Sequence, residues 1–97
     1  MNVSMTLDEL EQALHDERRA IVALDADAVF ALAERKLDLM RRLDGAEIGA
    51  EHATRFAGVV HDLRNNCMLL ANARDLARGA VESMITGRRG VRVSVTG

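Results

Sequence analysis

Three histidines and one cysteine are the side chains of this sequence that could act as metal ligands or nucleophiles. A helical zinc site of the HExxH type needs two histidines at positions i and i+4. His15, His52 and His61 lack this spacing, which favours solvated surface positions. Cys67 would need a neighbouring base, and His61 lies off the i+3 or i+4 positions that share a helix face with it. These residues predict neither a metal site nor a catalytic centre.

No glycine-rich phosphate loop follows a predicted strand in the sequence. Gly58 and Gly79 fall inside a predicted helix, where each costs up to about 1 kcal/mol relative to alanine. They allow close approach of another helix, or they are tolerated defects, and the sequence leaves both interpretations open. We therefore predict a protein that is not an enzyme and that binds no cofactor.

The composition favours helices. Of the 97 residues, 48% are hydrophobic and only 2% aromatic, and there is no proline. Sheets favour β-branched and aromatic residues, and proline is the strongest helix breaker. The 13 basic and 15 acidic residues give a net charge of −2, without the basic surface and stacking aromatics typical of nucleic-acid binding. We predict an all-α protein that does not bind nucleic acid.

The single cysteine cannot form an intrachain disulfide, which fits a reducing compartment. No stretch near the N-terminus combines a basic start with an apolar run. The longest apolar run in that region, residues 20–24, is far shorter than a membrane span. The expectation is a cytoplasmic protein without membrane insertion.

A first helical arm is predicted over residues 6–44, within a single domain of residues 1–97. Thr6, with Glu9 three residues later, forms a capping box and predicts the helix start. One apolar stripe then recurs in steps of three and four, with Glu17 filling its one gap. Its members are Leu7, Leu10, Leu14, Ile21, Leu24, Ala28 and Ala31.

Beyond Ala31 the stripe changes phase. The apolar positions become Val29, Leu32, Leu39 and Leu43, together with Phe30, Ala33, Leu37 and Met40. Either Asp25 or Asp27 could cap a new helix. The arm therefore has a kink or break near Asp25–Asp27, as one kinked helix or as two helices.

A second arm is predicted over residues 51–86, after a turn at 45–50. Its apolar positions follow 4-3-4-3 spacing, which is the heptad pattern of coiled coils. The seam consists of Phe56, Val60, Leu63, Cys67, Leu70, Arg74, Ala77, Val81 and Met84. Arg74 is its one polar member; it extends to the edge of the seam, or it sets the register, or it pairs with a partner's carboxylate.

Two arms joined by a short turn are expected to run antiparallel, as a helical hairpin or coiled-coil-like bundle. A lone hairpin of this size has a net stability close to zero, because burial and ordering entropy nearly cancel. A third packed segment or a homodimer would supply the missing burial. Residues 87–97 are predicted to be a flexible C-terminal tail, or a segment that orders against a partner.

These residues resemble FlgN-type flagellar export chaperones over residues 7–86. The similarity lies in Ala-Leu-Asp at 23–25, Ala-Leu-Ala-Glu-Arg-Lys at 31–36 and Leu-Met-Arg-Arg-Leu at 39–43 in the first arm. Asn-Cys-Met-Leu-Leu at 66–70 is similar to an Asn-Gly-x-Leu-Leu region of the second. The sequence departs from the family pattern at Asp25-Ala26-Asp27, which replaces Gly-Asp, at Cys67, which replaces glycine, and at Leu63, which replaces an asparagine.

The resemblance implies a cytoplasmic type III export chaperone for hook–filament junction proteins. It would bind the amphipathic C-terminal helices of these clients, prevent their premature assembly and deliver them to the export apparatus, without a cofactor. The partner-binding residues that the resemblance implies are Asn66, Leu69, Leu70, Ala77, Val81, Met84, Ile85, Val91 and Val93. The alternative is a homodimeric coiled-coil protein with a structural or regulatory role.

Overall fold

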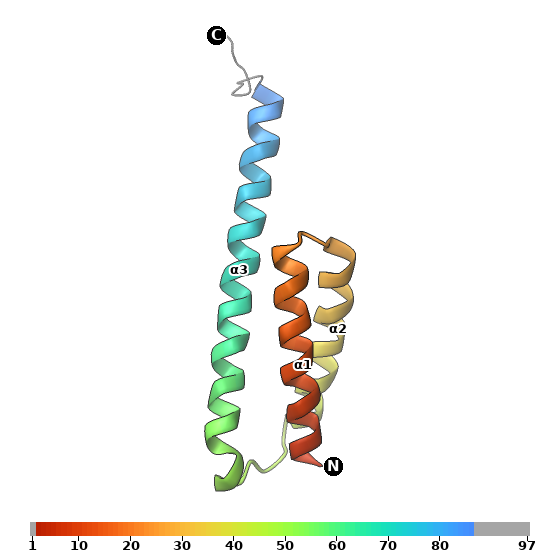
Figure 1. Cartoon of the computed structure of the whole chain (residues 1–97), viewed down its shortest axis with the longest axis vertical. Coiled ribbons are helices and arrows are strands. Elements are labelled where there is room, and N and C mark those ends of the chain that lie inside the picture. The colour runs from red at the N-terminus through yellow and green to blue at the C-terminus, as the bar shows by residue number, and fades with distance from the viewer. Residues whose placement is uncertain (1, 87–97) are drawn as a thin grey trace.

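The computed structural model describes residues 2–86. These residues form three α-helices, α1 (Val3–Val22), α2 (Ala26–Leu43) and α3 (Ala53–Thr86), with a short 3-10 helix, η1 (Ala50–His52), before α3. Figure 1 shows α1 and α2 as a hairpin lying beside one half of α3. The predicted all-α fold is confirmed, and no strand occurs in the part of the chain described. The predicted tail at 87–97 lies outside it.

The break in the first arm is real, and it reverses the chain. α1 ends at Val22, and the Asp25 side chain caps α2 by accepting a hydrogen bond from the backbone N of Ala28, at 3.1 Å. Between them Leu24 adopts a φ of +56°, in the left-handed region. The first arm is therefore two antiparallel helices (Figure 1), joined by ion pairs such as Lys36 to Glu17.

The predicted N-cap at Thr6 is wrong. α1 begins one turn earlier, at Val3, because Asn2 caps it and accepts a hydrogen bond from the backbone N of Met5 at 3.1 Å. Thr6 lies buried within the helix, where its hydroxyl donates to the Asn2 carbonyl. Asparagine is as strong a cap as threonine, so the extra turn follows from local chemistry.

The core forms around the apolar stripe of α1, as predicted. Leu7, Leu10, Leu14 and Ile21 are buried, and so is Glu17 in the gap of the stripe. α2 supplies Leu39 and Leu43, and α3 supplies Val59. The stripe ends before Leu24, which is 74% exposed in the turn.

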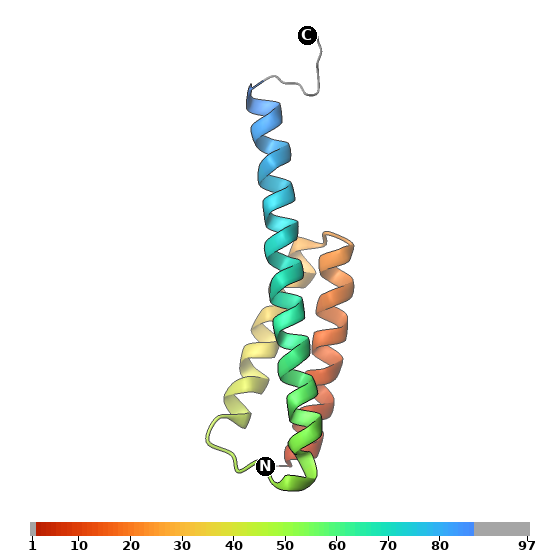
Figure 2. The same cartoon turned by 90° about the vertical axis from the view of Figure 1, so that its left-hand side faces the viewer.

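α3 runs parallel to α1 and antiparallel to α2. Arg55 lies beside Glu11 and Asn66 lies beside Glu17, so the residue numbers increase together along the two helices. At a rise of about 1.5 Å per residue, the 34 residues of α3 extend roughly 50 Å, whereas the hairpin helices extend about 30 Å. The C-terminal part of α3 therefore projects beyond the hairpin (Figures 1 and 2).

The connection from α2 to α3 matches the predicted turn at 45–50 and helix at 51–86 to within two residues. α2 ends at Leu43, and Gly45 has a φ of +80°. Glycine adopts this left-handed conformation without the steric cost of a side chain. α3 begins at Ala53, after η1.

Gly58 and Gly79 are expected to be tolerated defects. A Cβ atom at either position would meet nothing within 4 Å. We expect Gly58→Ala and Gly79→Ala each to raise the free energy of unfolding by about 0.5–1 kcal/mol, because alanine loses less backbone entropy in a helix. Urea titration followed by circular dichroism measures this, and Gly45→Ala serves as a destabilising control because of its positive φ. A loss of stability at either helical position would instead indicate close approach of another helix.

Candidate helix-binding groove

A buried polar network joins all three helices at mid-height. Glu17 of α1 is 1% exposed. Its Oε2 accepts from Lys36 Nζ of α2 at 2.9 Å, and its Oε1 accepts from Asn66 Nδ2 of α3 at 2.9 Å. Asn66 Nδ2 also donates to the Leu14 carbonyl at 2.8 Å. Sequence reasoning placed Asn66 among the partner-binding residues, but it is 3% exposed and its amide is engaged inside the bundle.

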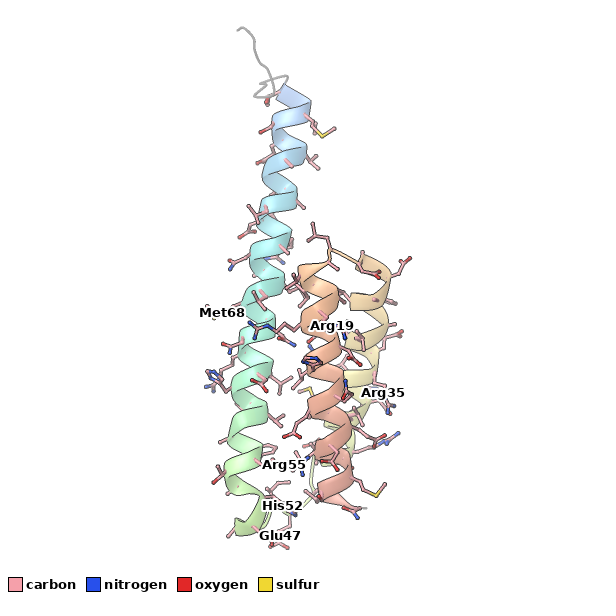
Figure 3. The ribbon with its side chains drawn as sticks, in the orientation of Figure 1. Arg19, Arg35, Glu47, His52, Arg55 and Met68 are labelled. Atoms are coloured by element: carbon pink, nitrogen blue, oxygen red, sulfur yellow. The ribbon has the colours of Figure 1, made fainter. Side chains whose placement is uncertain are left out.

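Arg55 fixes the beginning of α3 against α1. Its guanidinium donates to both carboxylate oxygens of Glu11, at 2.8 and 3.1 Å, and to Asp8. Hydrogen bonds to Glu11 and then to Asp8 raise the pKa of the Arg55 guanidinium. Figure 3 shows Arg55 between the two helices. This clamp and the Asn66 contacts position α3 mainly against α1.

α2 and α3 leave a groove between them, because α1 is the helix that packs closely against both others. Figure 2 shows the C-terminal end of α2 diverging from α3. A cleft of about 590 Å³ occupies this region, and a second of about 550 Å³ lies near the turn between α1 and α2. The first is lined by Leu37 and Met40 of α2 and by Phe56, Val60 and Leu63 of α3. The second is lined by Phe30 and Ala33 of α2 and by Leu70, Arg74 and Ala77 of α3.

We call the surface formed by these ten residues the α2–α3 groove. Its two walls are apolar stripes with alternating three- and four-residue spacing. The α2 wall follows the positions 30, 33, 37 and 40. The α3 wall follows the predicted seam from Phe56 to Ala77 except at Cys67, which lines neither cleft. Arg74 thus lies in the wall of an open groove and is exposed.

The predicted seam packs between the arms only in part, because Phe56 and Leu63 lie half-buried against the core and no seam residue is fully buried. α3 buries Val59 and Asn66 instead, while Phe56, Val60 and Leu63 are half-buried and Leu70 is exposed. Cys67, predicted to act as a small apolar seam residue, is exposed. The reason is that the α3 face that packs on α1 is rotated from the seam and includes a polar residue, Asn66, that a search for apolar spacing passes over.

Most of the other predicted partner-binding residues lie on the outer surface of α3. Leu70 and Ala77 line the groove, and Val81 and Met84 continue the same stripe onto the projecting part, with Ile85 beside them. These five are exposed, Met84 by 77%. Leu69 is half-buried and borders a separate cleft of about 500 Å³, with Leu76 and Leu24. Val91 and Val93 lie outside the described residues.

The groove residues that the predicted partner-binding set missed are the four of α2 and, on α3, Phe56, Val60, Leu63 and Arg74. Phe30, Leu37 and Met40 are exposed, although they are large and apolar. The sequence did contain a signal for them, because Phe30, Ala33, Leu37 and Met40 form one of the two apolar sets predicted after the stripe changes phase. Leu39 and Leu43, from the other set, occupy the core, so one helix presents two apolar faces to two different neighbours.

The histidines are separated from one another and from the groove lining. His15 and His61 are exposed, and His61 lies 3.1 Å from Asn65 Nδ2. Within residues 2–86, no three His, Cys, Asp or Glu side chains are grouped so as to hold a metal ion. None of the helices in that part of the chain combines the length and apolarity needed to cross a membrane. What the groove offers a partner is therefore an apolar contact surface.

Comparisons with protein-family models, with curated proteins and with solved structures give no match to this chain. The fold and the groove define it as a three-helix bundle with an apolar groove between its second and third helices.

Proposed function

We propose that this protein is an export chaperone that binds an amphipathic helix of its client in the α2–α3 groove. The observation that carries the proposal is the pair of apolar stripes with heptad spacing that line the two clefts. Such stripes pack against a further helix by inserting side chains into one another's gaps. A client helix in this position would complete a four-helix bundle.

The dimensions of the groove suit a helix of about six turns. From Phe56 to Ala77 the α3 wall extends roughly 32 Å at 1.5 Å per residue. Phe30, Leu37, Met40 and Leu70 are exposed along the two walls. Full burial of such a side chain contributes about 1.5–3 kcal/mol, and these partly exposed ones retain a fraction of that for binding. Val81 and Met84 extend the contact surface onto the projecting part of α3.

The resemblance to FlgN-type chaperones supports a specific class of client. It covers residues 7–86 and points to the C-terminal helices of hook–filament junction proteins, in the cytoplasm. Helices that pair with one another during assembly carry apolar stripes that would aggregate if exposed. A chaperone groove that covers such a stripe would prevent premature assembly until export.

Co-expression with C-terminal fragments of hook–filament junction proteins tests the proposal. We expect co-purification as a one-to-one complex with a fragment that includes the terminal amphipathic helix, and none with a matched fragment that ends before it. Failure of the folded protein to retain any junction-protein fragment would contradict the proposed function.

A homodimeric coiled-coil protein is a second candidate, which the projecting part of α3 favours. Met84 and Ile85 are more than three-quarters exposed there, and a second copy could cover them. Light scattering with and without a client fragment distinguishes the two. A tight dimer that ignores the client would support this second function, whereas a species that changes to a one-to-one complex would support the chaperone.

A further inference from the structure

We infer that the helix bound in the α2–α3 groove has one acidic flank, lying along α3, and one basic flank, lying along α2. The inference rests on the proposed function and specifies the chemistry of the partner. It comes from the charges that border the groove. The α2 border is acidic and the α3 border is basic over the half of the groove nearest the α1–α2 turn.

The acidic border of α2 follows from helical spacing. Asp27 lies three residues before Phe30 and Glu34 lies four after it, so both are its neighbours on the helix surface. The buried residues Leu39 and Leu43 lie on the other side of the groove stripe, against α1. Asp27 and Glu34 are exposed and therefore form the outer border of the groove.

The basic border of α3 follows in the same way. Arg74 lines the groove itself, and Arg78 lies one turn further along the same side. The buried residues Val59 and Asn66 define the opposite, α1-facing side of the helix. Both arginines are exposed.

These border charges remain available to a partner. Among the described residues, Asp27, Glu34 and Arg74 form no ion pair, and Arg78 has only an exposed contact of 3.9 Å with Asp75. Elsewhere on α2, Arg35 pairs with Glu9 and Lys36 with Glu17 of α1, both at 2.9 Å. Arg41 lines the cleft at the other end of the groove, so the acidic border is confined to the half nearest the α1–α2 turn. A helix entering the groove would therefore meet uncompensated charge of opposite sign on its two sides.

Opposite borders also determine the direction of the bound helix. Turning a helix end to end in the groove exchanges its two flanks. A helix with one acidic and one basic flank can therefore pair its charges with both borders in one direction only. Flanking charges set the orientation of helices in coiled coils in the same way. The borders would select both the partner and its orientation.

The test is a double-mutant cycle with synthetic 21-residue helical peptides. One peptide has leucine at its heptad core positions, glutamate on one flank and lysine on the other; a second has glutamine in place of every glutamate. We expect the unaltered protein to bind the glutamate peptide about three- to tenfold more tightly in low salt, since exposed ion pairs are individually weak. Arg74→Gln combined with Arg78→Gln should remove that preference.

Two exposed arginines of α1 outside the groove lining, Arg18 and Arg19, provide the matched control (Figure 3 labels Arg19). Arg18→Gln with Arg19→Gln should keep the preference for glutamate. An unchanged preference after the α3 substitutions would overturn the charge inference and leave the groove as a binding site. If neither peptide binds, or if binding survives Leu37→Asp, the proposed function fails and the inference fails with it.

Discussion

Glu17→Ala is expected to lower the free energy of unfolding by about 3–5 kcal/mol, which is most of the stability of a small domain. Glu17 is buried and accepts hydrogen bonds from Lys36 and Asn66 on the two other helices. Removing its carboxylate leaves an ammonium group and an amide without their partner in a largely dry environment. Urea denaturation followed by circular dichroism measures the loss.

Two further variants separate charge from hydrogen bonding. Glu17→Gln retains an acceptor for Asn66 but removes the charge facing Lys36, and we expect an intermediate loss. Replacing Glu17, Lys36 and Asn66 together by leucine removes every polar group of the network. Because buried ion pairs gain little over apolar packing, this triple variant should be about as stable as the original protein or more stable. A triple variant as unstable as Glu17→Ala would contradict this expectation. It would show that the polar network stabilises the fold more than apolar packing at the same three positions does.

The second large effect concerns the groove. Leu37→Asp is expected to weaken capture of a client helix by about 100-fold or more. The substitution replaces an apolar contact by a carboxylate that must lose its water on binding, and Arg41 is the one basic side chain among the residues lining that cleft. Leu37 lines the groove and is 48% exposed in the unbound protein, so the fold should lose little stability. Fluorescence anisotropy with a labelled client fragment measures the binding, and circular dichroism checks the fold.

Met68→Asp is the matched control for this substitution. Met68 is 64% exposed, and Figure 3 shows it on the side of α3 that faces away from the hairpin. The same change in charge and size at this position should leave client binding within about twofold, since surface substitutions away from an interface cost little. Equal losses from both variants would mean that the client does not use the α2–α3 groove.

Local sequence patterns were sufficient for the helices themselves. The apolar stripe of α1, the turn after Leu43 and the capping aspartate at the break are all read from residues a few positions apart. Helix formation, capping and termination depend on such short-range interactions, so they can be predicted without knowing the fold. The error at Thr6 was of the same local kind, because two adequate caps lie four residues apart.

The sequence by itself therefore determined an all-α chain, the approximate limits of its arms and the break near Asp25. Only the tertiary structure decided that the break reverses the chain, that Asn66 lies inside and that the α3 seam borders a groove. The physical reason is that periodicity marks an apolar face without stating what covers it. The bond between Asn66 and Glu17 joins residues 49 positions apart, and such contacts exist only once three helices have packed.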